Sequence, residues 1–129
     1  MLGDRDARNT HLLELADKLL PMPVELKNEQ TRVHGCMSTV HLFGRASGDE
    51  KRIDFLADSD AHIVRGLIAL LQRLYSGQRA IEILEFQIED FFRRIGLDQF
   101  ITSQRRNGLA GMVSRIRATA SRALEQGSA

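Results

Sequence analysis

The chain has 129 residues and a formal net charge of +1, which suits one domain and gives no global reason to expect nucleic acid or an anionic membrane as partner. Apolar residues make up 43% and charged residues 27%, which excludes disorder through low hydrophobicity. No apolar run approaches a membrane span, no secretory signal is visible, and the single cysteine excludes an internal disulfide, so we expect one cytoplasmic domain over residues 1–129, with its core at about 10–125.

The N-terminal part predicts one helix from about Thr10 to Leu20. Leucines and an alanine recur there at helical spacing, and Thr10 is a plausible N-cap. Pro21 and Pro23 are expected to end this helix because proline lacks the amide donor.

Two strands are predicted next. Residues Thr39 to Phe43 alternate with period two, and so do residues Arg52 to Phe55, with a turn signal at Ser47-Gly48-Asp49 between them. This spacing predicts an antiparallel hairpin. We expect a short third strand around Arg32-Val33, because a lone hairpin is marginal in water.

The second half of the chain predicts helices. One should start at Asp58-Ser59-Asp60, whose side chains can cap it, and end at Gly77. Another should span Ile88 to Ile95, closed by Gly96. The last should begin near Thr102 or Ser103 and bury one face, formed by Leu109, Met112, Val113, Ile116 and Ala120. The fold class predicted is α+β, with a small antiparallel sheet of about three strands packed against several helices.

Cys36 is the main chemical candidate. It falls on a loop between two predicted strands, and Gly35 allows a tight backbone there. Nearby positive charge favours the reactive thiolate, and Arg32 or His34 is close enough in sequence to supply it. The alternative is that Cys36 is a buried packing residue, since free cysteine often behaves as a small hydrophobe.

Other kinds of site have weaker support. The four histidines lie in no recognised metal spacing, and one cysteine cannot complete a zinc site, so we expect no metal and no cofactor. A catalytic pair of Cys36 with His34 or His41 would need a third orienting group. The segment from Ser103 to Leu109 is either an anion site at a helix N-terminus or a capped helix start with exposed arginines.

Three blocks of the sequence resemble the SufE family of sulfur-acceptor proteins. Order and spacing match from about Leu12 to Ala120. The blocks are Arg32-Val33-His34-Gly35-Cys36-Met37-Ser38-Thr39-Val40, then Ala57-Asp58-Ser59-Asp60-Ala61-His62-Ile63-Val64-Arg65-Gly66-Leu67, and Thr102-Ser103-Gln104-Arg105-Arg106-Asn107-Gly108-Leu109.

The resemblance implies a SufE/IscU-like fold and a persulfide-accepting Cys36. It implies a sulfur carrier that takes sulfur from a SufS-type pyridoxal-phosphate cysteine desulfurase and stimulates it, rather than an independent enzyme. Delivery would be to an iron–sulfur scaffold complex such as SufBCD, by a monomer or homodimer.

The resemblance also assigns roles to single residues. Arg105 matches the family's arginine and is the candidate for stabilising anionic sulfur. His34 is a weaker candidate, from its closeness to Cys36 in the sequence. Six residues are expected to support the loop or the structure around it: Gly35, Ser38, Asp58, Asp60, Asn107 and Gly108. His41 departs from the pattern, because the family usually has an aromatic residue there.

Two other classes of function remain open from the residues. A binding-only regulator of a desulfurase would work without the thiol of Cys36. A small cysteine-dependent hydrolase or redox enzyme would act without any protein partner.

Overall fold

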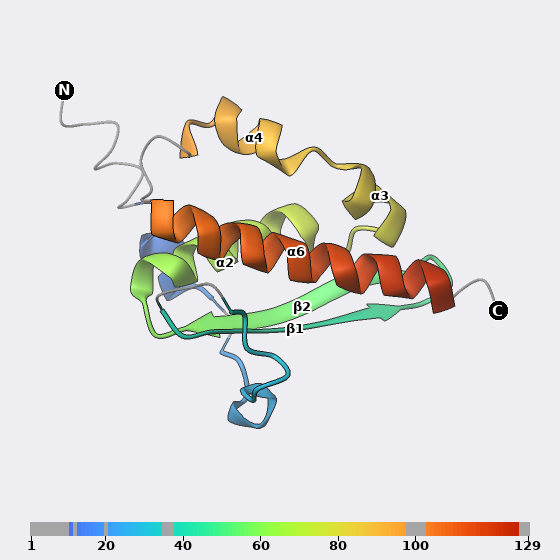
Figure 1. The fold of residues 1–129 in the computed structure, drawn as a ribbon, viewed down its shortest axis with the longest axis horizontal. Coiled ribbons are helices and arrows are strands. Elements are labelled where there is room, and N and C mark those ends of the chain that lie inside the picture. Colours follow the sequence, from blue (N-terminus) through green and yellow to red (C-terminus); the bar gives the residue numbers. More distant parts are fainter. Residues whose placement is uncertain (1–10, 12, 20, 35–37, 98–102, 127–129) are drawn as a thin grey trace.

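The computed structural model describes residues 11, 13–19, 21–34, 38–97 and 103–126, with the side chains of 103–105 excepted. Its elements are η1 (Val24–Leu26), β1 (Val40–Ser47), β2 (Arg52–Ser59), α2 (His62–Tyr75), α3 (Ala80–Glu85), α4 (Ile88–Arg94) and α6 (Ser103–Gln126). Figure 1 shows α6 crossing the hairpin, with α3 and α4 on the side of α6 away from the strands. The predicted α+β class is confirmed.

The hairpin is antiparallel, as predicted. Val40 pairs with Ser59 at one end and Ser47 with Arg52 at the other. Burial alternates over Val40–Phe43 in β1 and over Arg52–Ala57 in β2, because successive side chains point to opposite faces of a sheet. Val40, Leu42, Ile53, Phe55 and Ala57 thereby form the buried face.

The third strand predicted around Arg32-Val33 is reduced to a single bridge. In the described residues the sheet has two strands, and Arg32 forms only an isolated bridge to His41. A second isolated bridge joins Arg52 to Arg79 on the other edge. Each edge of the hairpin is therefore covered by a short piece of chain that satisfies backbone groups without forming a further strand.

The core lies between the hairpin and the helices α2 and α6. The predicted inner face of α6 is confirmed, since all five of its apolar residues are buried. Helix α2 buries Leu67, Ile68 and Leu71 against the same core. In the N-terminal part, residues 13–17 are helical and Leu15 is buried, whereas the expected cap Thr10 lies outside the described residues.

Two helices depart from the sequence-based expectation. Helix α2 begins at His62 with Ala61 at its N-cap and no side-chain cap, so the predicted capping by Asp58, Ser59 and Asp60 is wrong. Strand β2 continues to Ser59, and the acidic residues are used elsewhere. Helix α3 was not predicted, whereas α4 and the start of α6 lie where they were expected.

We expect Gly77→Ala to destabilise the fold by about 1–2 kcal/mol, because Gly77 has φ 80°, in the left-handed region that side chains disfavour. Its amide also donates to the Ile53 carbonyl at 2.8 Å, which fixes this conformation. Urea unfolding measures the change. The neighbouring exposed residue gives the control, Ser76→Ala, for which we expect a change within about 0.5 kcal/mol. Equal stability of the two variants would contradict the prediction.

Candidate functional site

The candidate site is the loop that carries Cys36. Gly35, Cys36 and Met37 lie outside the described residues, so the site is known from its two ends. The chain enters the loop through residues 30–34, here named the entry arm, and leaves it through Ser38 and Thr39 into β1. The contacts of these two flanking segments show which elements hold the two ends of the loop.

Backbone hydrogen bonds close the base of the loop. The Val33 amide donates to the Val40 carbonyl at 2.8 Å, and the Leu42 amide donates to the Thr31 carbonyl at 2.7 Å. Val33 and Thr31 are both buried, so these bonds are shielded from water. The entry arm is thus held along the edge of β1, and Cys36 belongs to a closed loop between Val33 and Val40.

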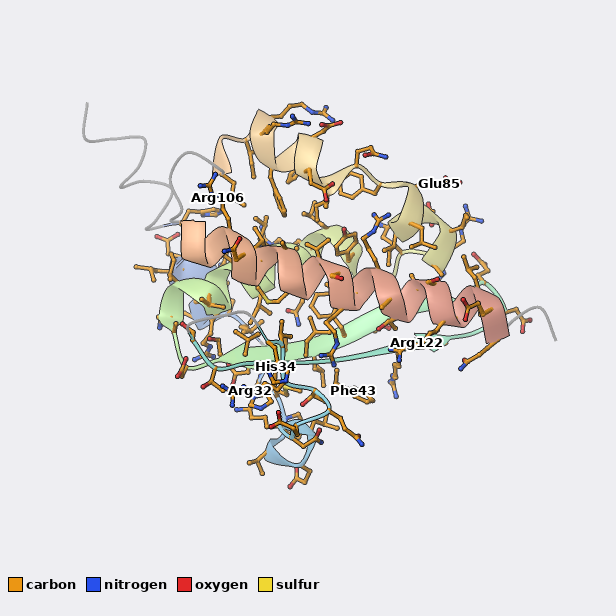
Figure 2. The ribbon with its side chains drawn as sticks, viewed as in Figure 1. Arg32, His34, Phe43, Glu85, Arg106 and Arg122 are labelled. Atoms are coloured by element: carbon orange, nitrogen blue, oxygen red, sulfur yellow. The ribbon has the colours of Figure 1, made fainter. Side chains whose placement is uncertain are left out.

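Helix α6 holds the entry arm from another side. The Arg115 guanidinium donates through Nη1 to the Arg32 carbonyl at 2.9 Å and through Nη2 to the Gln30 carbonyl at 2.7 Å. Gly111 lies one turn earlier, and a Cβ built there would meet Val33 Cγ1 at 3.1 Å. Figure 2 shows Arg32 and His34 on the sheet side of α6, whose two ends are marked by Arg106 and Arg122.

The exit from the loop is held by an acidic side chain. Asp60 Oδ1 accepts a hydrogen bond from the Thr39 amide at 3.1 Å, and the Asp60 amide donates to the Thr39 carbonyl at 3.3 Å. Asp60 therefore holds the backbone of Thr39, just after the loop. Ser38, just before Thr39, is half-buried.

Asp58 joins three segments by ion pairs. Its Oδ2 accepts from Lys27 Nζ at 2.9 Å, and its Oδ1 lies 3.3 Å from Arg65 Nε in α2. Burial alone would raise the pKa of Asp58, but the hydrogen bonds from Lys27 and the Ser59 amide and the charges of Lys27 and Arg65 lower it below its ordinary value. Sequence reasoning missed Lys27 and Arg65, because nothing local connects them to Asp58.

His34 lies at the surface, at the end of the entry arm (Figure 2). Its side chain is 71% exposed, and its Nε2 lies 3.4 Å from Glu29 Oε1, an ion pair only when the imidazole is protonated. The contact joins two exposed side chains, so it adds little to the stability of the fold. His41, the other histidine considered for a pair, is half-buried in β1.

The third sequence block forms the start of α6. Arg105 lies in its first turn, but its side chain is outside the described part of the chain. Asn107 is exposed, and Gly108 is buried. Arg106 is exposed at the same end of the helix (Figure 2).

Metal and membrane sites find no support in the described parts of the chain. No group of three histidine, cysteine, aspartate or glutamate side chains gathers there as metal ligands. No helix there is long and apolar enough to cross a membrane.

Comparison with known proteins gives the class. The family described as "SufE: Fe-S metabolism associated domain" matches residues 1–120. An uncharacterised SufE-like protein of Rhizobium meliloti is 40% identical over 92% of this chain and 86% of its own length. Another, from Rhizobium etli, is 42% identical over 90% of this chain and 80% of its own length.

The fold has a solved counterpart too. The solution structure of a hypothetical protein from Thermus thermophilus matches with a TM-score of 0.77 and 28% identity, over 93% of this chain and 86% of that chain. The matching domain defines a protein of iron–sulfur metabolism. The chain belongs to the SufE family, so the resemblance read from its three sequence blocks is confirmed.

We expect Asp58→Asn to lower stability at pH 7 by about 0.5–1 kcal/mol, because the ion pairs are partly exposed. A carboxylate with a lowered folded-state pKa stabilises the fold above its unfolded pKa, roughly 3.9, and that stability is lost as pH falls through the folded pKa. The difference between wild type and variant should therefore shrink in acid.

Urea unfolding at a series of pH values measures this difference. The control is Asp49→Asn, an exposed aspartate in the hairpin turn. A difference for Asp58→Asn that stayed constant down to pH 3 would show that the charge of Asp58 is not the source of its contribution.

Proposed function

We propose that this protein is a cytoplasmic sulfur carrier that accepts persulfide sulfur on Cys36 from a SufS-type cysteine desulfurase. The protein stimulates the desulfurase by unloading it. It then delivers the sulfur for iron–sulfur cluster assembly, to a scaffold complex such as SufBCD. It acts as a monomer or homodimer and performs no independent catalysis.

The transfer step is a thiol–disulfide type of exchange. The Cys36 thiolate attacks the outer sulfur of the desulfurase persulfide, a new S–S bond forms on Cys36, and the old S–S bond breaks. The desulfurase cysteine leaves as a thiolate and takes up a proton. The sulfane sulfur keeps its oxidation state, so no external oxidant or reductant is needed.

The observation that carries the proposal is the family match over residues 1–120, which spans the sole cysteine of the chain. The geometry around that cysteine supports it. The loop between Val33 and Val40 is closed at its base by backbone hydrogen bonds, and Thr39 is held at its exit by Asp60. A reactive group on a loop held by a rigid scaffold is a frequent arrangement in functional sites.

We expect intact-protein mass spectrometry, after incubation with a cognate desulfurase and L-cysteine, to show a gain of about 32 Da that a reductant removes. Cys36→Ser should show no gain and should keep the wild-type melting temperature, because a loop thiol contributes little core area. The matched control is a desulfurase variant that lacks its own persulfide cysteine.

Each rival function predicts a different result. A wild-type chain that gains no sulfur from a persulfidated desulfurase would contradict the carrier proposal. Stimulation that survived in Cys36→Ser would favour a binding-only regulator. Turnover of a thioester or peptide without any protein partner would favour a cysteine-dependent hydrolase.

We expect Arg105→Ala to slow sulfur acceptance by on the order of tenfold, because a guanidinium near Cys36 would stabilise anionic sulfur. The adjacent exposed arginine provides the matched control, Arg106→Ala, which removes the same charge and should leave the rate unchanged. Single-turnover transfer from a persulfidated desulfurase measures both. Equal rates for the two variants would remove Arg105 from the site.

A further inference from the structure

Arg115 connects α6 to the chain that leads into the Cys36 loop. Its two terminal nitrogens donate to carbonyls of Gln30 and Arg32, at 2.7 and 2.9 Å. These acceptors lie 85 and 83 residues away in sequence, so the contact joins the C-terminal helix to the N-terminal third of the chain. No other guanidinium in the described residues bonds to the entry arm.

The carbonyls of Gln30 and Arg32 are not used by β1. Residues 29–31 form a turn in which the Thr31 and Arg32 amides donate to the Asn28 carbonyl, and Arg32 then forms an isolated bridge to His41. The Thr31 carbonyl accepts from the Leu42 amide of β1, whereas the carbonyls of Gln30 and Arg32 accept from Arg115. Arg115 thus satisfies two carbonyls of the entry arm that do not bond to β1.

Arginine suits this position for a geometric reason. Its planar guanidinium presents several N–H donors in a fixed fork, so one side chain can satisfy two carbonyls at once. A lysine ammonium is a compact charge on a flexible stem and holds two acceptors less rigidly. Arg115 itself is placed by α6, where its own carbonyl accepts from Thr119 Oγ1 at 3.0 Å.

Gly111 lets the entry arm approach α6 closely. A Cβ there would lie 3.1 Å from Val33 Cγ1 and 3.5 Å from the His34 carbonyl oxygen. Gly111 and Arg115 are one helical turn apart and lie on the same face of α6. The helix therefore contacts the arm from Gln30 to His34, up to the residue before the Gly35-Cys36 pair.

We infer that Arg115 is a positioning residue for sulfur acceptance: it holds the entry arm against α6, and so sets the position from which Cys36 meets the donor persulfide. This inference rests on the proposed function. A displacement of about 1 Å in a reacting group can cost on the order of a hundredfold in rate, so a contact that fixes the base of the loop can control the reaction without touching sulfur.

The test compares Arg115→Ala and Arg115→Lys with a matched control on the same helix. Arg117 also bonds to backbone carbonyls, those of Ile83 at 3.4 Å, Leu84 at 3.1 Å and Phe86 at 3.5 Å. Arg117→Ala therefore removes guanidinium–carbonyl contacts of the same kind, but at α3 and the residue after it instead of at the entry arm. A persulfidated cognate desulfurase at saturating concentration serves as sulfur donor, and hydrogen exchange at the Val33 and Leu42 amides reports the arm itself.

We expect Arg115→Ala to slow single-turnover sulfur transfer by on the order of tenfold, with unchanged affinity for the desulfurase and faster exchange at Val33 and Leu42. Arg115→Lys should recover part of the rate, and Arg117→Ala should leave rate and exchange at these amides unchanged. A wild-type rate in Arg115→Ala would overturn the inference, whether or not exchange rises. An equal rate loss in Arg117→Ala would also overturn it, because the effect would then be general destabilisation.

Failure of the proposed function gives a different pattern. A wild type that gains no sulfur from the desulfurase rejects the carrier role itself. Faster exchange at Val33 and Leu42 in Arg115→Ala would then still show that Arg115 holds the arm, while the positioning role in transfer would be rejected with the carrier role.

Discussion

The packing of α6 across the hairpin is the constraint on which the rest of the structure depends. A two-stranded sheet is marginal in water by itself, so the hairpin needs an apolar surface to cover it. Helix α6 provides that surface through its buried face, and it contacts β1, β2, α2 and α3. Gly44 in β1 permits the close approach, since a Cβ there would lie 3.0 Å from Thr119 Oγ1.

The same helix also organises the polar groups around the core. Loops that run beside a helix carry backbone carbonyls that neither sheet nor helix satisfies. Arg115 takes up two of them on the entry arm, and Arg117 takes up those at the end of α3. Two arginines two positions apart thus hold two separate segments, because neighbouring positions on a helix point in different directions.

The sequence predicted those elements whose pattern is local. The period-two alternation found the hairpin, and the apolar face predicted for α6 is the buried one. Helix α3 escaped because the six residues Ala80–Glu85 are too short for a helical period to be read. Asp58 and Asp60 looked like caps because acidic residues favour helix starts, yet strand pairing carried β2 through to Ser59.

In the candidate site too, local features could be predicted from the sequence and long-range contacts could not. Cys36 was proposed from its loop position and from family resemblance, both of which can be read in a few adjacent residues. The contacts around the loop could not be predicted, because they join residues that are distant in sequence. Arg115 lies 83 positions from Arg32 and 85 positions from Gln30, and Lys27 lies 31 positions from Asp58. Neither Arg115 nor Lys27 stands in a local sequence motif that indicates these contacts. Their roles exist only once the fold brings the segments together.

The hydrogen bonds at the two ends of the Cys36 loop do not involve the cysteine itself. They use backbone groups of Thr31, Val33 and Thr39, together with the Asp60 carboxylate, and none requires a thiol. The charge of Asp58 is matched by Lys27 and Arg65, so this carboxylate joins three segments of the fold without leaving its charge unpaired.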